Sequence, residues 1–117
     1  MPLLQTAPLR VAAIGRTGRG DWGHAIDELW QRQPGTEMVA VADESTEGLA
    51  KAVARHGLPP AAGFRDWQEM LAKAKPDIVA ICMRHVDCHA EMAIGGAASG
   101  TKGIFMEKPF VRTPAEA

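Results

Sequence analysis

The sequence predicts an α/β fold, a doubly wound parallel sheet of the Rossmann type with five strands. Its apolar residues occur in short continuous runs, as is typical of strands that are buried on both faces of a parallel sheet. Amphipathic segments of helical length lie between these runs. Such an alternation builds successive right-handed strand–helix–strand units, and it therefore favours a parallel sheet with helices on both faces.

Five segments are expected to be strands, and they are residues 9–14, 37–42, 61–64, 77–83 and 103–106. The third is the weakest, because only four residues are available after Pro59 and Pro60. Four segments are expected to be helices, and they are residues 24–33, 45–56, 66–72 and 87–99. Gly57 is placed to end the second helix, while Asp66 and Asp87 are placed to cap the third and fourth. Ligands of such sheets lie at the carboxyl ends of the strands, so the search for a site begins there.

Composition narrows the class of protein. The chain has 117 residues with a formal net charge of −1, and 46% of its residues are hydrophobic and 23% charged. These values are typical of one globular domain, which we assign to residues 9–117 after an N-terminal tail at residues 1–8. We expect no nucleic-acid or membrane partner, because no basic run and no membrane-length apolar run is present. Cys82 and Cys88 fit a reducing compartment, so we expect a cytoplasmic protein.

A glycine-rich loop follows the first expected strand. Glycines at this point let the backbone turn sharply and approach a phosphate group. Two frames compete, Gly15-x-Thr17-x-x-Gly20 and Gly18-x-Gly20-x-x-Gly23, and we prefer the first because it begins where the strand ends. Arg16 and Arg19 add positive charge that suits a dinucleotide. The residues expected to bind a cofactor here are Gly15, Arg16, Thr17, Gly18, Arg19 and Gly20.

An acidic residue follows the second expected strand. Asp43 lies 28 residues after Gly15 and 20 after Gly23. A carboxylate at this position can accept both adenosine ribose hydroxyls and repels a 2′-phosphate, so we expect NAD as the cofactor in preference to NADP. Glu44 adds to that repulsion. Two alternatives remain open, namely an acid that only complements the dipole of the next helix and an S-adenosylmethionine site of a methyltransferase.

The end of the fifth strand carries the triplet Glu107-Lys108-Pro109. With the glycine loop, Asp43 and a histidine that opens a helix after the fourth strand, this triplet resembles the Gfo/Idh/MocA family of NAD(P)-dependent oxidoreductases. The resemblance implies that the triplet lies beside the nicotinamide, that Lys108 contacts substrate and is catalytic, and that Glu107 and Pro109 contact the cofactor. It also implies that the Lys108-Pro109 bond is a candidate cis peptide.

The segment after the fourth strand completes the expected site. His89 matches the family's histidine, and Arg84 stands where many relatives have a different sequence, within reach of a phosphate or an anionic substrate. We count both as cofactor-binding candidates. His85 and His89 flank Cys88, but no second cluster supplies further ligands, so we expect no metal.

Family members also carry a second domain that covers the nicotinamide and contacts the substrate. We therefore expect this chain to be a truncated oxidoreductase, inactive alone, whose whole protein is a homo-oligomer acting on a sugar-like or cyclitol-like alcohol or carbonyl. The alternative is a non-catalytic NAD-binding sensor or assembly module.

Overall fold

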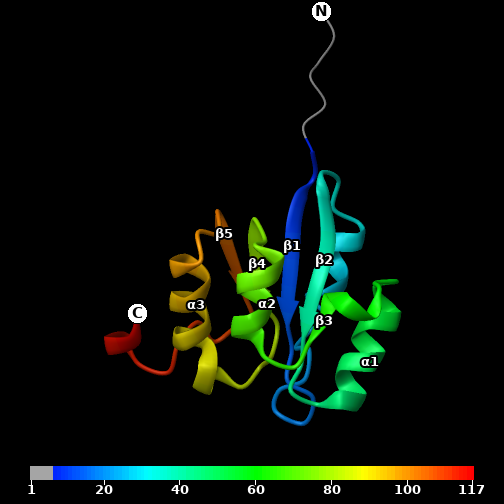
Figure 1. Cartoon of the computed structure of the whole chain (residues 1–117). Coiled ribbons are helices and arrows are strands. Elements are labelled where there is room, and N and C mark those ends of the chain that lie inside the picture. Colours follow the sequence, from blue (N-terminus) through cyan, green and yellow to red (C-terminus); the bar gives the residue numbers. More distant parts are fainter. Residues whose placement is uncertain (1–6) are drawn as a thin grey trace, which may run out of the picture.

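The computed structural model describes residues 7–117, and so most of the expected tail at residues 1–8 lies outside the described residues. Five parallel strands form one sheet in the order β3-β2-β1-β4-β5 (Figure 1). The strands are β1 (Leu9–Ile14), β2 (Thr36–Ala42), β3 (Gly63–Phe64), β4 (Ile78–Ile81) and β5 (Gly103–Met106). The strand order reverses between β1 and β4, which is where doubly wound sheets bind their ligands. The predicted fold class is confirmed.

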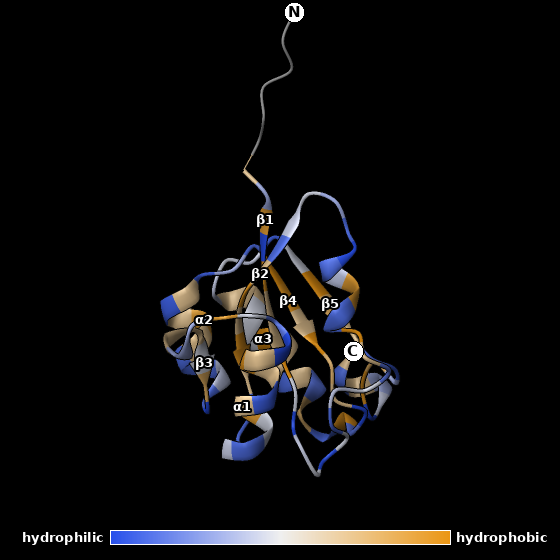
Figure 2. Cartoon of the chain, turned by 90° about the vertical axis from the view of Figure 1, so that its right-hand side faces the viewer, coloured by the Kyte–Doolittle hydropathy of each residue, from blue (hydrophilic) through white to orange (hydrophobic). Residues whose placement is uncertain are grey.

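Alternation along the buried strands divides the core into two layers. Ala12 and Ile14 of β1 face one side of the sheet, where Met70 of α2 (Trp67–Ala74) and Met92 of α3 (His89–Ala98) cover them. Val11 of β1 faces the other side, which is covered by α1 (Thr46–Arg55) and by the segment around Trp30. β1 and β4 therefore read as continuous apolar runs because both of their faces are covered (Figure 2). β5 differs from the expectation, because it lies at the edge of the sheet and leaves Ile104 and Phe105 37% and 42% exposed.

Three helix ends follow the local sequence. Ser45 caps α1, since its hydroxyl accepts a hydrogen bond from the Gly48 N–H at 3.1 Å, and Gly57 follows α1 in the left-handed conformation. Asp66 caps α2 by accepting from the Gln68 N–H at 2.8 Å. The third strand is shorter than expected, because residues 60–62 form a 3-10 turn instead.

The helix expected at residues 24–33 is wrong. The chain forms turns there, followed by a short 3-10 helix at Glu28–Gln31. Gly23 and Ala25 have φ values of 62° and 59°, which lie in the left-handed region and cannot start a right-handed helix. The apolar spacing of this segment therefore indicates only that Ile26, Leu29 and Trp30 pack against the core.

The cap expected from Asp87 is also wrong. Residues Val86–Cys88 form a 3-10 turn, and α3 begins at His89 without a side-chain cap. In the part of the chain that the structure describes, no helix is long and apolar enough to span a bilayer.

Candidate functional site

The carboxyl ends of the strands bring the four predicted segments to one edge of the sheet. The glycine loop follows β1, Asp43 and Glu44 follow β2, residues 82–89 follow β4, and Glu107 follows β5 (Figure 1). A groove of about 290 Å³ opens at this edge. It is lined by Ile14, Gly15, Arg16, Ala42, Asp43, Glu44, Arg65, Asp66, Trp67, Cys88, Glu91 and Met92.

The glycine loop begins directly at the end of β1 and closes on itself. The Gly15 N–H donates to the Ala42 carbonyl at 2.9 Å, which holds the start of the loop against β2. Arg16 and Asp21 then exchange two backbone hydrogen bonds of 3.0 Å each. The Arg84 N–H donates to the Gly20 carbonyl at 3.1 Å, so the far side of the loop leans on the chain after β4.

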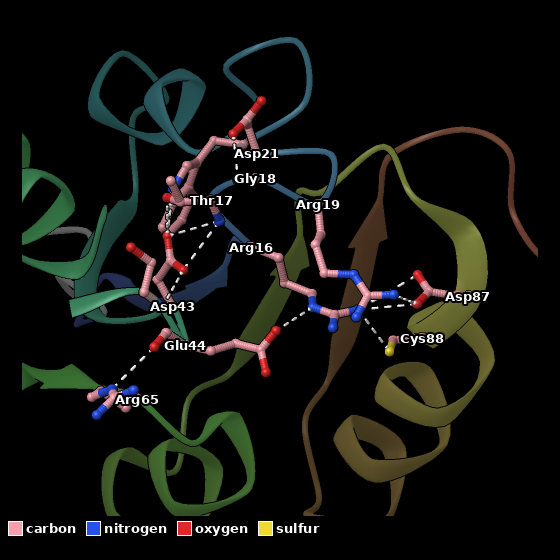
Figure 3. A network of polar contacts seen from close by, with 12 residues as sticks. Arg16, Thr17, Gly18, Arg19, Asp21, Asp43, Glu44, Arg65, Asp87 and Cys88 are labelled. Carbon is pink, nitrogen blue, oxygen red and sulfur yellow. Dashed lines mark hydrogen bonds and ion pairs between the residues drawn. The ribbon is translucent and has the colours of Figure 1, made fainter. Parts of the chain in front are cut away.

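Arg16 crosses the groove from β2 to the chain after β4. Its Nε lies 2.9 Å from Glu44 Oε1, and its Nη1 lies 3.2 Å from Asp87 Oδ2 and 3.0 Å from Cys88 Sγ (Figure 3). Arg19 Nη2 reaches the same Asp87 oxygen at 3.1 Å. Burial alone would raise the pKa of Asp87, but the two guanidinium groups outweigh it and lower that pKa. This pairing explains why Asp87 does not cap α3.

Because no α-helix follows the loop, the positive charge for an anionic ligand has a different source. A Rossmann loop normally combines free N–H groups with the N-terminus of a helix. Here the two arginines Arg16 and Arg19 lie at the loop instead, and Arg16 lines the groove. Both guanidinium groups are paired with carboxylates, so an anionic ligand at this edge would compete with Glu44 and Asp87 for them.

Asp43 is buried, with 1% of its surface exposed. Its carboxylate accepts from the Thr17 N–H at 3.1 and 3.2 Å, the Thr17 hydroxyl at 2.5 Å, the Trp22 indole N–H at 3.3 Å and the Ser45 N–H at 3.0 Å. Asp43 thus joins β2 to the glycine loop and to the start of α1.

Glu107 is buried as well, and it joins the end of β5 to the glycine loop. It accepts from the His24 N–H at 2.8 Å and the Lys108 N–H at 3.1 Å, and its Oε2 lies 2.9 Å from His24 Nδ1. Burial would raise the pKa of Glu107, but these donors outweigh it and lower that pKa. The Lys108-Pro109 bond is cis, and the Lys108 side chain is exposed at the same edge.

His89 is fully buried and bonds to main-chain carbonyls on two segments. Its Nδ1 lies 2.8 Å from the Pro109 oxygen and 3.2 Å from the Phe110 oxygen, while its Nε2 lies 2.8 Å from the Met83 oxygen. A carbonyl oxygen only accepts, so each contact is a hydrogen bond where the facing ring nitrogen carries a proton, and the His89 ring lies between the Glu107-Lys108-Pro109 turn and the end of β4.

Among the groove residues that sequence reasoning did not predict are Arg65 and Trp67. Arg65 and Trp67 follow β3, and Arg65 Nε donates to the Glu44 carbonyl at 3.0 Å. Their signal is position alone, since they come just after a strand of only two residues. Arg84 lies outside this groove, exposed on the rim of a neighbouring hollow that it shares with Arg19, His85 and Arg112. Among residues 7–117, no group of three or more metal-ligating side chains forms.

Comparisons with known proteins match this architecture. A model described as an oxidoreductase family with an NAD-binding Rossmann fold covers residues 9–117. Glycosyl hydrolase family 109 protein 1 of Bacteroides thetaiotaomicron is 30% identical over 94% of this chain and 25% of its own. D-glucoside 3-dehydrogenase of Escherichia coli is 31% identical over 97% of this chain and 31% of its own.

Solved structures agree on the fold. The WlbA dehydrogenase of Bordetella pertussis, in complex with NADH and UDP-GlcNAcA, superposes with a TM-score of 0.77 at 21% identity, over 97% of this chain and 32% of that one. The chain thus spans between a quarter and a third of the length of the relatives it matches. The family model covers the glycine loop and the Glu107-Lys108-Pro109 turn alike. This chain therefore belongs to the Gfo/Idh/MocA family of oxidoreductases and is an NAD(P)-binding Rossmann domain.

Proposed function

We propose that this domain binds NAD, in preference to NADP, for an oxidoreductase that acts on a sugar-like or cyclitol-like alcohol or carbonyl. The observation that carries the proposal is the groove between the ends of β1, β2 and β4, with the glycine loop on one side and the cis Lys108-Pro109 turn at the same edge of the sheet. When bound, a nicotinamide supplies hydride transfer. The relative that is named D-glucoside 3-dehydrogenase supports the sugar-like substrate class.

Each predicted site residue has a proposed part in this function. Arg16 and Arg19 would neutralise the pyrophosphate, beside a loop that carries Gly15, Thr17, Gly18 and Gly20. Pro109 would shape the nicotinamide end, and Arg84 would reach a phosphate or an anionic substrate. Lys108 is the proposed catalytic residue, because an exposed ammonium at this edge can polarise a substrate oxygen. Asp43, His89 and Glu107 would act through the backbone segments that they hold.

We further propose that the whole protein is cytoplasmic, forms a homo-oligomer and contacts its small-molecule substrate through residues outside this chain. The two free thiols, Cys82 and Cys88, support a reducing compartment. The homo-oligomer and the substrate contacts outside this chain are implied by the resemblance to the family.

Glycoside hydrolysis is a second candidate activity, because a relative 30% identical to this chain is named as a glycosyl hydrolase. With either activity we assign the dinucleotide to this domain, because the family model that matches it is described as NAD-binding. An assay of the whole protein with an alcohol and with a glycoside of the same sugar separates them.

Calorimetric titration of the chain with NAD⁺ and with S-adenosylmethionine tests the binding proposal. We expect saturable binding of NAD⁺ and none of S-adenosylmethionine. Arg19→Gln should weaken NAD⁺ binding by about tenfold, because it removes a charged partner of the pyrophosphate. The matched control is Arg32→Gln, an exposed arginine outside the groove, which should leave the affinity unchanged. Tight binding of S-adenosylmethionine without any response to NAD⁺ would overturn the proposal.

A further inference from the structure

The carboxylate of Asp43 has no room for a ribose hydroxyl. An ionised carboxylate offers about four lone-pair positions. Four donors occupy those of Asp43, namely the N–H and hydroxyl of Thr17, the indole N–H of Trp22 and the N–H of Ser45. The residue is also 1% exposed. A cofactor hydroxyl would have to displace one of these donors before Asp43 could bind it.

These same contacts assign Asp43 another task. Thr17 lies within the glycine loop, Trp22 lies at its end, and Ser45 caps α1. A single buried carboxylate therefore sets the position of the loop relative to the first helix. Gly48 of α1 permits this, because a Cβ atom at Gly48 would collide with the Thr17 hydroxyl and approach Asp43 Oδ2.

Glu44 follows Asp43 at the end of β2, and its carboxylate is exposed in the groove. Its side chain is 62% exposed and lines the groove. Arg16 Nε holds Oε1 at 2.9 Å, while Oε2 has no hydrogen-bond partner among residues 7–117. The Glu44 main-chain oxygen also accepts from Arg65 Nε at 3.0 Å, so that a second guanidinium lies at the same rim.

Two other acids line the groove. Asp66 is committed to the cap of α2, where it accepts from the Gln68 N–H at 2.8 Å. Glu91 belongs to α3, which follows β4 on the other side of the point where the strand order reverses. The adenosine ribose of a doubly wound sheet lies at the end of the second strand, which is the position of Glu44.

We propose that Glu44 is the residue that discriminates NAD from NADP, and that Asp43 is a positioning residue that holds the glycine loop. This inference rests on the proposed function, since it concerns the same dinucleotide groove. The free oxygen of Glu44 accepts the ribose hydroxyls and repels a 2′-phosphate. Without the Glu44 charge, the exposed guanidinium of Arg65 at this rim would attract that phosphate.

The test is a titration of the chain and its variants with NAD⁺ and NADP⁺, reported as the ratio of the two dissociation constants. Glu44→Gln should narrow this ratio about tenfold, the change that corresponds to roughly 1.4 kcal/mol. Asp43→Asn should weaken both cofactors by a similar factor and leave the ratio within about twofold. The matched control is Glu47→Gln, the same change on an exposed glutamate of α1 outside the groove, which should alter neither affinity.

A second variant guards against loss of folding in Asp43→Asn. Thr17→Val removes only the hydroxyl that Asp43 accepts, and it too should weaken both cofactors without moving the ratio. The inference is overturned if Asp43→Asn or Thr17→Val narrows the ratio, or if Glu44→Gln leaves it unchanged. Failure of the proposed function gives a different result, because the unmodified chain would then bind neither dinucleotide.

Discussion

At the scale of single residues, Gly23 shows how closely the loop is fitted to the sheet. Its φ is 62°, and a Cβ atom there would collide with the Cys82 carbonyl and with Glu107 Oε2. Gly18 lies in the same loop with a φ of 84°, but a Cβ atom there would meet nothing within 4 Å. A side chain at Gly18 would therefore meet only backbone strain, whereas a side chain at Gly23 would meet backbone strain and a collision.

Alanine substitutions at these two positions should differ in their effect on stability. Gly18→Ala should lower the free energy of unfolding by about 1 kcal/mol, through backbone strain alone. Gly23→Ala should lower it by about 1 to 3 kcal/mol more, because the carbonyl and the carboxylate must also move. Urea denaturation measures the free energy of unfolding of both variants. Equal decreases would show that the loop moves around a Gly23 side chain without additional cost.

Thr17 and Asp43 show that the role of a polar residue depends on contacts that its residue type does not reveal. In the preferred frame of the motif, Thr17 stands at the position of the second glycine. In the structure its hydroxyl and N–H both donate to Asp43, so the side chain points to the protein and holds the loop. Residue type alone did not reveal this, because the donor and the acceptor lie 26 residues apart in the chain.

At the scale of elements, the segment between the loop and β2 depends on long-range contacts for its shape. Asp27 is 1% exposed, and its Oδ2 lies 2.9 Å from Arg55 Nη2 and 2.8 Å from His56 Nε2. The guanidinium of Arg55 also lies 5.2 Å from the centroid of the Trp22 ring. A buried carboxylate held by the end of α1 therefore anchors the turns that replace the expected helix.

Removal of the Asp27 charge should release this segment. Asp27→Asn should lower the free energy of unfolding by about 3 kcal/mol, because it leaves Arg55 and His56 without their buried partner. The neighbouring Glu28 lies 3.8 Å from Arg55 but is half exposed, so Glu28→Gln should change stability by less than about 0.5 kcal/mol. Comparable losses in the two variants, measured by urea denaturation, would contradict an anchoring role for Asp27.

At the scale of the whole molecule, three carboxylates join parts of the chain that are distant in sequence. Asp27 pairs with Arg55, Asp87 with Arg16, and Glu107 with His24. Burial would raise the pKa of each carboxyl group, but its partners outweigh burial and lower that pKa. Each group therefore binds a proton less readily in the folded chain than in the unfolded chain.

Stability should accordingly fall in acid. The unfolded state binds more protons as the pH drops, so the contribution of these pairs is present above about pH 5 and is lost as the pH falls through the lowered pKa values. Urea midpoints measured from about pH 6 to about pH 3 should decrease steadily. Asp27→Asn should reduce that decrease, whereas an unchanged midpoint across the range would contradict the three pairings.

Hydrophobic pattern was enough to predict most of the architecture. β1, β5 and the bodies of α1, α2 and α3 lie within a few residues of their expected positions, because short apolar runs and local caps are encoded by neighbouring residues. The parallel order and the position of the groove follow from the alternation of strands and helices. The sequence also led to the family, through the glycine loop and the Glu107-Lys108-Pro109 triplet.

Tertiary structure alone decided which partner each polar side chain takes. Asp87 and Asp27 read as an ordinary helix cap and an ordinary helix residue, yet both are taken by arginines that lie far away in the chain. Asp43 is saturated by the loop, and this leaves Glu44 as the exposed acid. Charge pairing acts through space and hydrophobic periodicity acts along the chain, so the sequence determined the sheet and the edge that carries the site, while folding decided which side chains remain free for a ligand.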